Sequence, residues 1–265
     1  MVDWKGDPAI LSLSESIRPM INFSKELNSQ QLEVVTNIDD PILVLAGAGS
    51  GKTRCIIYRA AYLIREKQIP PWKILIVTFT NKAANELQVR LEKLLGIPMR
   101  SLWVGTFHSL CSRILRYETS SIPFNSNFSI YDTDEQKSVL KRIYKEHGYD
   151  TQKFPVNKIL SRISRYKNRL ILPEEIEMAD FETNPFAKGF KNIYSLYQQS
   201  LLLNQAMDFD DILMFTAKPL QSNESVRLKY QQLFEYVMID EYQDTNKAQF
   251  EIIHQIANQD RKSVV

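Results

Sequence analysis

The chain has 265 residues, 44% of them hydrophobic and 24% charged, the composition of a globular protein with room for one large domain or two ordinary ones. Its 33 Lys and Arg residues against 31 Asp and Glu residues give a formal net charge of +2, which excludes nucleic-acid binding through bulk charge and requires any basic surface to be local. The spacing of Cys55, Cys111 and the three histidines fits neither a disulfide scaffold nor a Cys/His zinc site, so we expect a reducing, cytoplasmic setting. No segment reaches the roughly 20 apolar residues of a membrane-spanning helix, and we expect no membrane partner.

The first part of the chain predicts an arm followed by a strand, a helix and a second strand. Residues 1–26 are polar and without a clear period, so we interpret them as an N-terminal arm or short helix that lacks the layout of a secretory signal. The runs Pro41–Ala46, Lys73–Phe79 and Tyr236–Asp240 are short and almost continuously apolar, which is typical of strands covered on both faces of a parallel sheet. Between the first two, Thr53–Arg65 has the apolar spacing of one helix face. This order predicts an α/β fold.

The middle of the chain predicts helices instead of strands. Asp132 and Glu135 have the spacing of a capping box, and we expect the helix that they begin to end near Gly148. Further helical patterns lie at residues 159–163 and 190–203. Because strand-like runs occur on both sides of this block, we interpret it as a mainly helical subdomain inserted into the α/β domain. The expected bounds are 27–112 and 206–265 for the α/β domain and 113–205 for the insertion.

A glycine-rich loop stands between the first predicted strand and the helix after it. The loop reads AGAGSGKT, and such a loop presents backbone N–H groups and a helix N-terminus to phosphate oxygens. Lys52 supplies a positive charge to the β and γ phosphates, and the Thr53 hydroxyl can ligate Mg²⁺. The strict pattern begins with Gly where this chain has Ala46, and an accidental Gly-rich turn is the alternative interpretation. The predicted nucleotide-binding loop consists of Ala46, Gly47, Ala48, Gly49, Ser50, Gly51, Lys52 and Thr53.

Two acids follow the last predicted strand. Asp240 and Glu241 stand at its carboxyl end, where open α/β sheets bind their ligands. One carboxylate there can hold Mg²⁺, and a second can orient and deprotonate an attacking water. We assign the metal side to Asp240 and the general base to Glu241. The alternative is that both acids only cap the next helix.

Five segments then occur in a fixed order. Together they resemble the superfamily 1 DNA helicases of the UvrD, Rep and PcrA type, and the resemblance runs from about Leu27 to the end of the sequence. It implies a RecA-like P-loop NTPase fold, with ATP and Mg²⁺ as cofactors. The segments are AGAGSGKT with Arg54 after it, TFTNKAANEL (Thr78–Leu87), VGTFHSL (Val104–Leu110), MDFDDIL (Met207–Leu213) and DEYQDTN (Asp240–Asn246).

The resemblance also implies individual roles. LNSQQ is similar to the family segment whose glutamine reads the adenine edge, which is Gln31 here, and Arg54 is expected near the base or sugar. Without the family, Gln31 is only a polar residue near a helix start. DEYQ resembles the DExx box, in which Asp240 is a Mg²⁺ partner, Glu241 the base and Gln243 a sensor of the γ phosphate. The family's transition-state arginines lie in later motifs, so we expect the second RecA-like domain to be absent from this sequence.

Two of these segments carry polar and aromatic side chains, and the first of them, TFTNKAANEL, follows a predicted strand and opens a helix. Thr80, Asn81 and Lys82 can donate hydrogen bonds to backbone phosphates, and Phe79 offers a ring on which a base can stack. By themselves these residues would complete a buried strand and cap a helix. The resemblance favours a DNA-binding role over this structural one, because family members lay single-stranded DNA across this segment and across VGTFHSL. The expected contacts are Phe79, Thr80, Asn81, Lys82, Thr106, Phe107 and His108.

Charge is uneven inside the predicted insertion. From residue 137 to residue 169 the basic residues outnumber the two acids, Glu146 and Asp150, and either a nucleic-acid backbone or a solvated helix face explains them. In MDFDDIL, we interpret the three acids as a helix cap with acids in its first turn rather than as a metal cluster. The basic residues are Lys137, Lys141, Arg142, Lys145, Lys153, Lys158, Arg162, Arg165, Lys167 and Arg169; the capping acids are Asp208, Asp210 and Asp211.

The sequence therefore predicts the ATP-binding part of an ATP-dependent DNA helicase or translocase. The resemblance implies movement on single-stranded DNA and on junctions of single and double strands, with 3′ to 5′ polarity, in DNA repair or replication alongside accessory proteins. One alternative is the front part of a RecB-like or AddA-like helicase–nuclease. Another is an isolated module that binds ATP and single strands with little turnover, since we expect this sequence alone to be poorly active.

Overall fold

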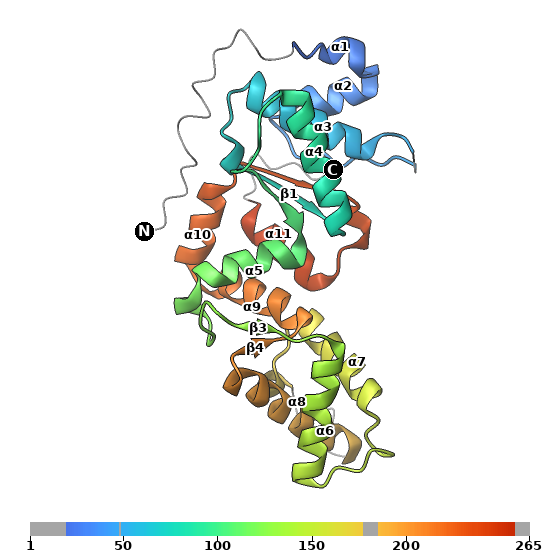
Figure 1. Ribbon diagram of the computed structural model, residues 1–265, viewed down its shortest axis with the longest axis vertical. Helices are drawn as coiled ribbons and strands as arrows, with labels where there is room; N and C mark the ends of the chain where they lie inside the picture. Colours follow the sequence, from blue (N-terminus) through green and yellow to red (C-terminus); the bar gives the residue numbers. More distant parts are fainter. Residues whose placement is uncertain (1–19, 48, 177–184, 258–265) are drawn as a thin grey trace. The chain divides into compact units, whose positions relative to one another are not determined.

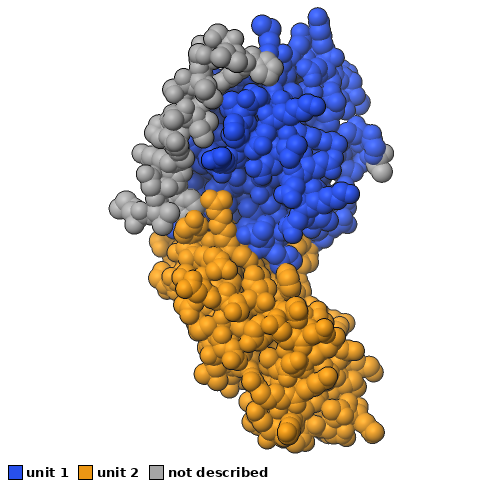
Figure 2. Space-filling view, in the orientation of Figure 1, with its two compact units in different colours: residues 1–110, 227–245, 253–265 blue, residues 111–226, 246–252 orange. Residues whose placement is uncertain are grey.

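The computed structural model describes residues 20–47, 49–176 and 185–257 of the chain. The chain divides into two compact units, and Figure 2 colours them separately. Unit 1 consists of residues 1–110, 227–245 and 253–265, and unit 2 of residues 111–226 and 246–252. The chain returns from unit 2 to unit 1 after residue 226. Residues 206–226 stay with unit 2 because helix α9 (Phe209–Ser222) packs on helix α7 (Val156–Asn168).

Unit 1 contains a parallel three-stranded sheet in the order β2-β1-β5. The strands are β1 (Ile74–Thr78), β2 (Trp103–Thr106) and β5 (Tyr236–Ile239). All residues of β1 and β5 are buried, as expected for apolar runs covered on both faces. Two predicted strands, in Lys73–Phe79 and Tyr236–Asp240, are therefore confirmed, and their carboxyl ends lie at the same edge of the sheet.

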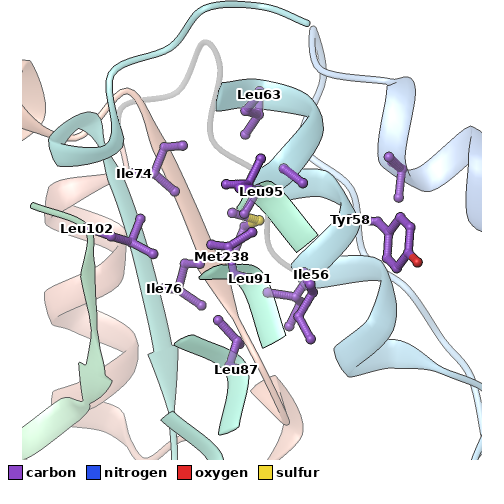
Figure 3. Close-up of a cluster of buried hydrophobic side chains, with 14 of the residues drawn as sticks. Ile56, Tyr58, Leu63, Ile74, Ile76, Leu87, Leu91, Leu95, Leu102 and Met238 are labelled. Atoms are coloured by element: carbon purple, nitrogen blue, oxygen red, sulfur yellow. The ribbon is translucent and has the colours of Figure 1, made fainter. Parts of the chain in front are cut away.

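Helices pack around this sheet and form the core of unit 1. They are α1 (Phe23–Glu26), α2 (Ser29–Thr36), α3 (Lys52–Arg65) and α4 (Asn81–Leu95), and a 3-10 turn at Pro71–Lys73 leads into β1. Figure 3 shows Ile56 of α3, Leu91 of α4 and Met238 of β5 within one buried cluster. The side chain of Phe23 joins the same cluster, so the end of the predicted N-terminal arm belongs to the core. The helix predicted from Thr53 to Arg65 is confirmed.

The strand predicted at Pro41–Ala46 is wrong as a covered strand. Residues 41–46 have no strand assignment and pair with no strand in the described part of the chain. Val44 packs against the core, whereas Leu43 and Leu45 on the opposite side are 59% and 87% exposed. The apolar pattern indicated a buried segment, but burial on both faces also requires neighbouring strands, which the pattern of one segment does not supply.

Unit 2 is mainly helical, with a short parallel pair of strands, β3 (Ser129–Ile130) and β4 (Ala206–Met207). Its longer helices are α6 (Thr133–His147), α7, α8 (Pro185–Leu203) and α9, which Figure 1 shows together. Asp132 and Glu135 form the predicted capping box, and Gly148 ends α6 in the left-handed conformation at φ 69°. Helical 3-10 turns lie at Thr119–Ser121 and Pro173–Glu175. The predicted helices of this block are confirmed.

Three helices have residues in both units: α5 (Phe107–Tyr117), α10 (Glu224–Leu233) and α11 (Lys247–Ile256). A 3-10 turn at Tyr242–Asp244 precedes α11. Among the described residues, no helix combines the length and apolar character needed to span a membrane.

Candidate nucleotide-binding site

The glycine-rich loop leads directly into α3. Gly51 is the N-cap residue of α3 with φ 95° and ψ 28°, and Gly49 also has a positive φ of 78°. The positive φ of Gly51 favours glycine there, and a Cβ atom at this position would lie 2.8 Å from the flexible end of the Gln31 side chain, which would have to shift. The first N–H groups of α3 thus stand at the end of the loop, as an anion site requires. Ala48 lies outside the described residues.

Lys52 and Thr53 connect this loop to the carboxyl end of β5. The Thr53 hydroxyl donates a hydrogen bond to Asp240 Oδ2 at 3.1 Å, although 187 positions separate the two residues. Lys52 Nζ donates to the carbonyl of Ala46 at 3.1 Å and lies 3.9 Å from Glu241 Oε2. The structure therefore brings the predicted phosphate loop and the predicted acidic strand end together at one place.

Asp240 is buried at this junction. Its backbone N–H donates to Val77 of β1 at 2.9 Å, which fixes the end of β5 against the neighbouring strand. Burial raises the pKa of its carboxyl, and the hydrogen bond from Thr53 opposes that rise. A hydroxyl next to a carboxylate is an oxygen donor set that suits Mg²⁺, which proteins bind through one or two such ligands together with substrate phosphates. No cluster of three or more His, Cys, Asp or Glu side chains that could hold a metal occurs in the described ranges.

Glu241 has an unusual backbone conformation. Its φ of 57° and ψ of 45° lie in the left-handed region, which few residues other than Gly, Asn and Asp adopt readily. Its side chain makes no capping hydrogen bond to the following turn, so the alternative that it only caps a helix lacks support. The carboxylate instead accepts a close hydrogen bond from the side-chain amide of Gln243. A strained residue held by its neighbours is typical of a functional position.

Gln31 and Arg54 flank the loop in different ways. Gln31 donates to the carbonyl of Ser50 at 3.1 Å and forms a capping box with Asn28 at the start of α2. It lines a cavity of about 240 Å³ together with Ala46, Ser50 and Lys52. Arg54 lies over the ring of Tyr58, 4.7 Å from its centroid, and lines a separate cavity of about 510 Å³. The structure places Gln31 at the loop and directs Arg54 to the neighbouring cavity.

The predicted DNA-contact segments meet at the ends of β1 and β2. The rings of Phe79 and Phe107 lie edge to face with their centroids 5.9 Å apart. Phe79 is half-buried, whereas Phe107 is only 3% exposed, so its ring packs inside the protein instead of facing solvent. Thr80 caps α4 by accepting a hydrogen bond from Ala83 N–H. Helix capping was the alternative interpretation of this residue. Of the predicted contact residues, the exposed ones are Thr80, Asn81 and Lys82.

The VGTFHSL segment contributes fewer exposed groups than its sequence indicated. The Thr106 hydroxyl donates to Ser109 Oγ at 3.2 Å and is buried at the end of β2. His108 is half-buried in the first turn of α5 and takes part in further interactions. The contact of this segment with the ring of Phe79 is made by the buried ring of Phe107.

A buried ionic cluster in unit 2 was missed by the sequence analysis. Lys167, counted there as part of a basic stretch, is fully buried, and its Nζ lies 2.7 Å from Asp208 Oδ2 and 2.7 Å from Asp211 Oδ1. Asp208 is the N-cap residue of α9 and forms a capping box with Asp211, so the predicted structural interpretation of MDFDDIL is confirmed. Burial, followed by the Asp208 charge, raises the pKa of Asp211 to about 7, and Lys167 opposes the rise. The signal in the sequence was that Asp208 and Asp211 stand among apolar residues in MDFDDIL, because carboxylates buried with such residues need a cation beside them.

The rest of the basic stretch is partly neutralised. Lys137 pairs with Asp134 at 3.0 Å, and Arg142 donates to Ser200 at 2.6 Å. The basic side chains that still lie close together are on α7, around a cavity of about 660 Å³. Its lining residues are Asn157, Lys158, Ser161, Arg162, Arg165, Tyr166 and Arg169.

Comparison with known proteins places the chain in a family. Residues 27–265 match the family described as the UvrD/REP helicase N-terminal domain, and the chain belongs to that family. The chain is 46% identical over 231 residues to the ATP-dependent DNA helicase PcrA of Bacillus subtilis, covering 87% of this chain and 31% of that relative. Proteins of the same name from Staphylococcus epidermidis (strain RP62A) and Staphylococcus aureus (strain Mu50) are 43% and 42% identical, over 88% of this chain and 32% of their own length. The chain thus spans about a third of the length of these relatives.

Proposed function

We propose that this chain is the ATP-binding part of a DNA helicase or translocase, in which MgATP hydrolysis is coupled to movement along single-stranded DNA. The hydrogen bond from Thr53 to Asp240 is the observation that carries the proposal, because it joins the phosphate loop to the acidic strand end. The names of the relatives, ATP-dependent DNA helicase PcrA, support the same function. We further propose that residues 27–112 and 206–265 form a RecA-like domain with an inserted helical subdomain at 113–205, as the family resemblance implies.

Each residue of the site has a separate role in the proposed hydrolysis of ATP. The N–H groups of the loop and of the first turn of α3 bind phosphate oxygens, and Lys52 neutralises charge that develops on them. Thr53 and Asp240 would hold Mg²⁺, which supplies Lewis-acid stabilisation of the phosphates when it is bound. Glu241 accepts the proton of the attacking water, and Gln243, hydrogen-bonded to Glu241, orients that carboxylate. Gln31 at the loop recognises the adenine edge.

Single-stranded DNA is the proposed partner of the surface at the end of β1. Asn81 and Lys82 are exposed at the start of α4, where the helix N-terminus also favours phosphate. Phe79 is half-buried and held by Phe107, which suits a ring that supports one base. Polarity of 3′ to 5′ and a role in DNA repair or replication follow the family resemblance and are part of the proposal.

Nucleotide binding tests the site directly. We expect Lys52→Ala to weaken ATP binding at least about tenfold in isothermal titration, while Lys25→Ala, an exposed lysine on α1, leaves it unchanged. Equal ATP affinity in the wild-type chain and Lys52→Ala would exclude this loop as the nucleotide site. Glu241→Gln should bind ATP as the wild-type chain does and lose hydrolysis, because an amide cannot accept the proton.

Turnover decides between a motor part and a binding module. We expect hydrolysis by the 265-residue chain to be slow and weakly stimulated by single-stranded DNA, measured as phosphate release with and without an oligonucleotide. Binding of ATP and of the oligonucleotide without any hydrolysis under single-turnover conditions would favour the binding module.

A further inference from the structure

The acidic turn Glu241–Thr245 is short and internally hydrogen-bonded. Asp244 N–H donates to the Glu241 carbonyl at 3.0 Å, and Thr245 N–H donates to the Tyr242 carbonyl at 3.2 Å. Glu241 begins the turn in the left-handed conformation, which is unfavourable for a residue with a long side chain. Such a conformation persists only where the surrounding contacts fix it. The two ends of the turn therefore decide where the Glu241 carboxylate stands.

The downstream end of the turn is fixed by Asn246. Its side-chain oxygen accepts a hydrogen bond from Gln249 N–H at 2.9 Å, and its own N–H donates to Gln249 Oε1 at 3.0 Å, so Asn246 caps α11. Capping uses only the oxygen of the side-chain amide. The nitrogen, Nδ2, donates instead to Asn168 Oδ1 at the end of α7, with a distance of 2.6 Å. Both residues of this contact belong to unit 2.

Asn168 is held so that its oxygen can only face Asn246. Its Nδ2 donates to Asp210 Oδ1 at 2.7 Å and to the Ser164 carbonyl at 2.9 Å. A flipped amide would turn an oxygen toward the Asp210 carboxylate and lose both bonds. The neighbouring residue, Lys167, is buried between two carboxylates, which immobilises the end of α7. The acceptor of Asn246 is therefore rigid, and the charge of Asp210 polarises its amide and strengthens the bond.

We infer that Asn246 and Asn168 are positioning residues for the hydrolysis reaction: their amide contact fixes the downstream end of the acidic turn and thereby the placement of Glu241 and Gln243. We assign neither residue a contact with substrate. The inference rests on the proposed function, since it gives the contact a role in ATP hydrolysis. The geometry favours this role over helix capping alone, because Ser or Asp would cap α11 as well as Asn, but neither carries the amide N–H that reaches Asn168.

The test uses Asn246→Ser and Asn246→Asp in the full chain. Both keep a capping oxygen, both remove the amide N–H that reaches Asn168, and only the second adds charge. We expect about tenfold slower hydrolysis of ATP bound under single-turnover conditions in each, with ATP affinity within about twofold of wild type. The control is Asn157→Ala, an exposed amide on the same helix α7, which should change neither quantity.

A second measurement does not depend on turnover. Hydrogen exchange of the Asp244 and Thr245 amides, followed by NMR, should be about tenfold faster in both variants, because opening of the turn becomes easier. Wild-type exchange rates in both variants, or wild-type hydrolysis rates, overturn the positioning role. If the wild-type chain itself fails to bind or hydrolyse ATP, the proposed function fails, and the exchange rates still decide whether the contact fixes the turn.

Discussion

Replacing Lys167 with Met tests whether the buried ionic cluster holds unit 2 together. The ammonium group is fully buried and stands 2.7 Å from a carboxylate oxygen on each of Asp208 and Asp211, which are 4% and 0% exposed at their side chains. Met preserves most of the volume and removes the charge, so two buried carboxylates are left facing each other. Breaking a buried ion pair from one side costs about 3–5 kcal/mol. At about 2–4 °C per kcal/mol for a chain of this size, the melting temperature should fall by about 6–20 °C.

The assay is thermal and urea unfolding of Lys167→Met against Lys141→Met, an exposed lysine on α6 whose loss should cost less than about 0.5 kcal/mol. The pH dependence gives a sharper check. The raised pKa of Asp211, about 7 against 3.8 in the unfolded chain, means that the folded state binds its proton more tightly, so stability falls as pH rises through that window. Without Lys167 the pKa rises further, and the loss of stability should be larger at pH 8 than at pH 5. A loss below about 1 kcal/mol, or one that shrinks as pH rises, would refute the reasoning.

Three smaller changes test other parts of the structure. Glu241→Asn should raise the free energy of unfolding by about 0.5–1 kcal/mol, because Asn tolerates the left-handed conformation, and it should abolish hydrolysis. If Glu241→Asn unfolds at a lower urea concentration than Glu241→Gln, the backbone of Glu241 is not strained. Arg59→Met should cost about 2 kcal/mol, since the buried guanidinium donates to the Val34 and Asn37 carbonyls at the end of α2, and an unchanged urea midpoint would argue against that role. Asp132→Ala should cost about 1 kcal/mol by removing the capping box of α6, and Asp132→Asn should restore most of it in the same melts.

The sequence by itself determined the local structure of this protein. Helix starts at Asp132 and Asp208 were readable because a capping side chain and the N–H groups that it accepts from lie within one turn. The same holds for the glycine-rich loop, where Gly51 and Lys52 are consecutive residues at a helix start. Two of the three predicted strands formed because their residues are apolar on both faces. Such signals depend only on neighbours in the chain.

Only the tertiary structure decided which residues meet. The hydrogen bond between Thr53 and Asp240 spans 187 positions, and the contact of Asn246 with Asn168 spans 78, so no local pattern encodes either. Lys167 was counted as one cation in a basic stretch, but the fold buries it between two acids. Phe107 was an expected DNA contact, but its ring is buried and packs against Phe79. The run at Pro41–Ala46 shows the same limit, because an apolar segment becomes a sheet strand only if another strand pairs with it. Burial and pairing are properties of the assembled fold, and they fix which of these side chains remain available for function.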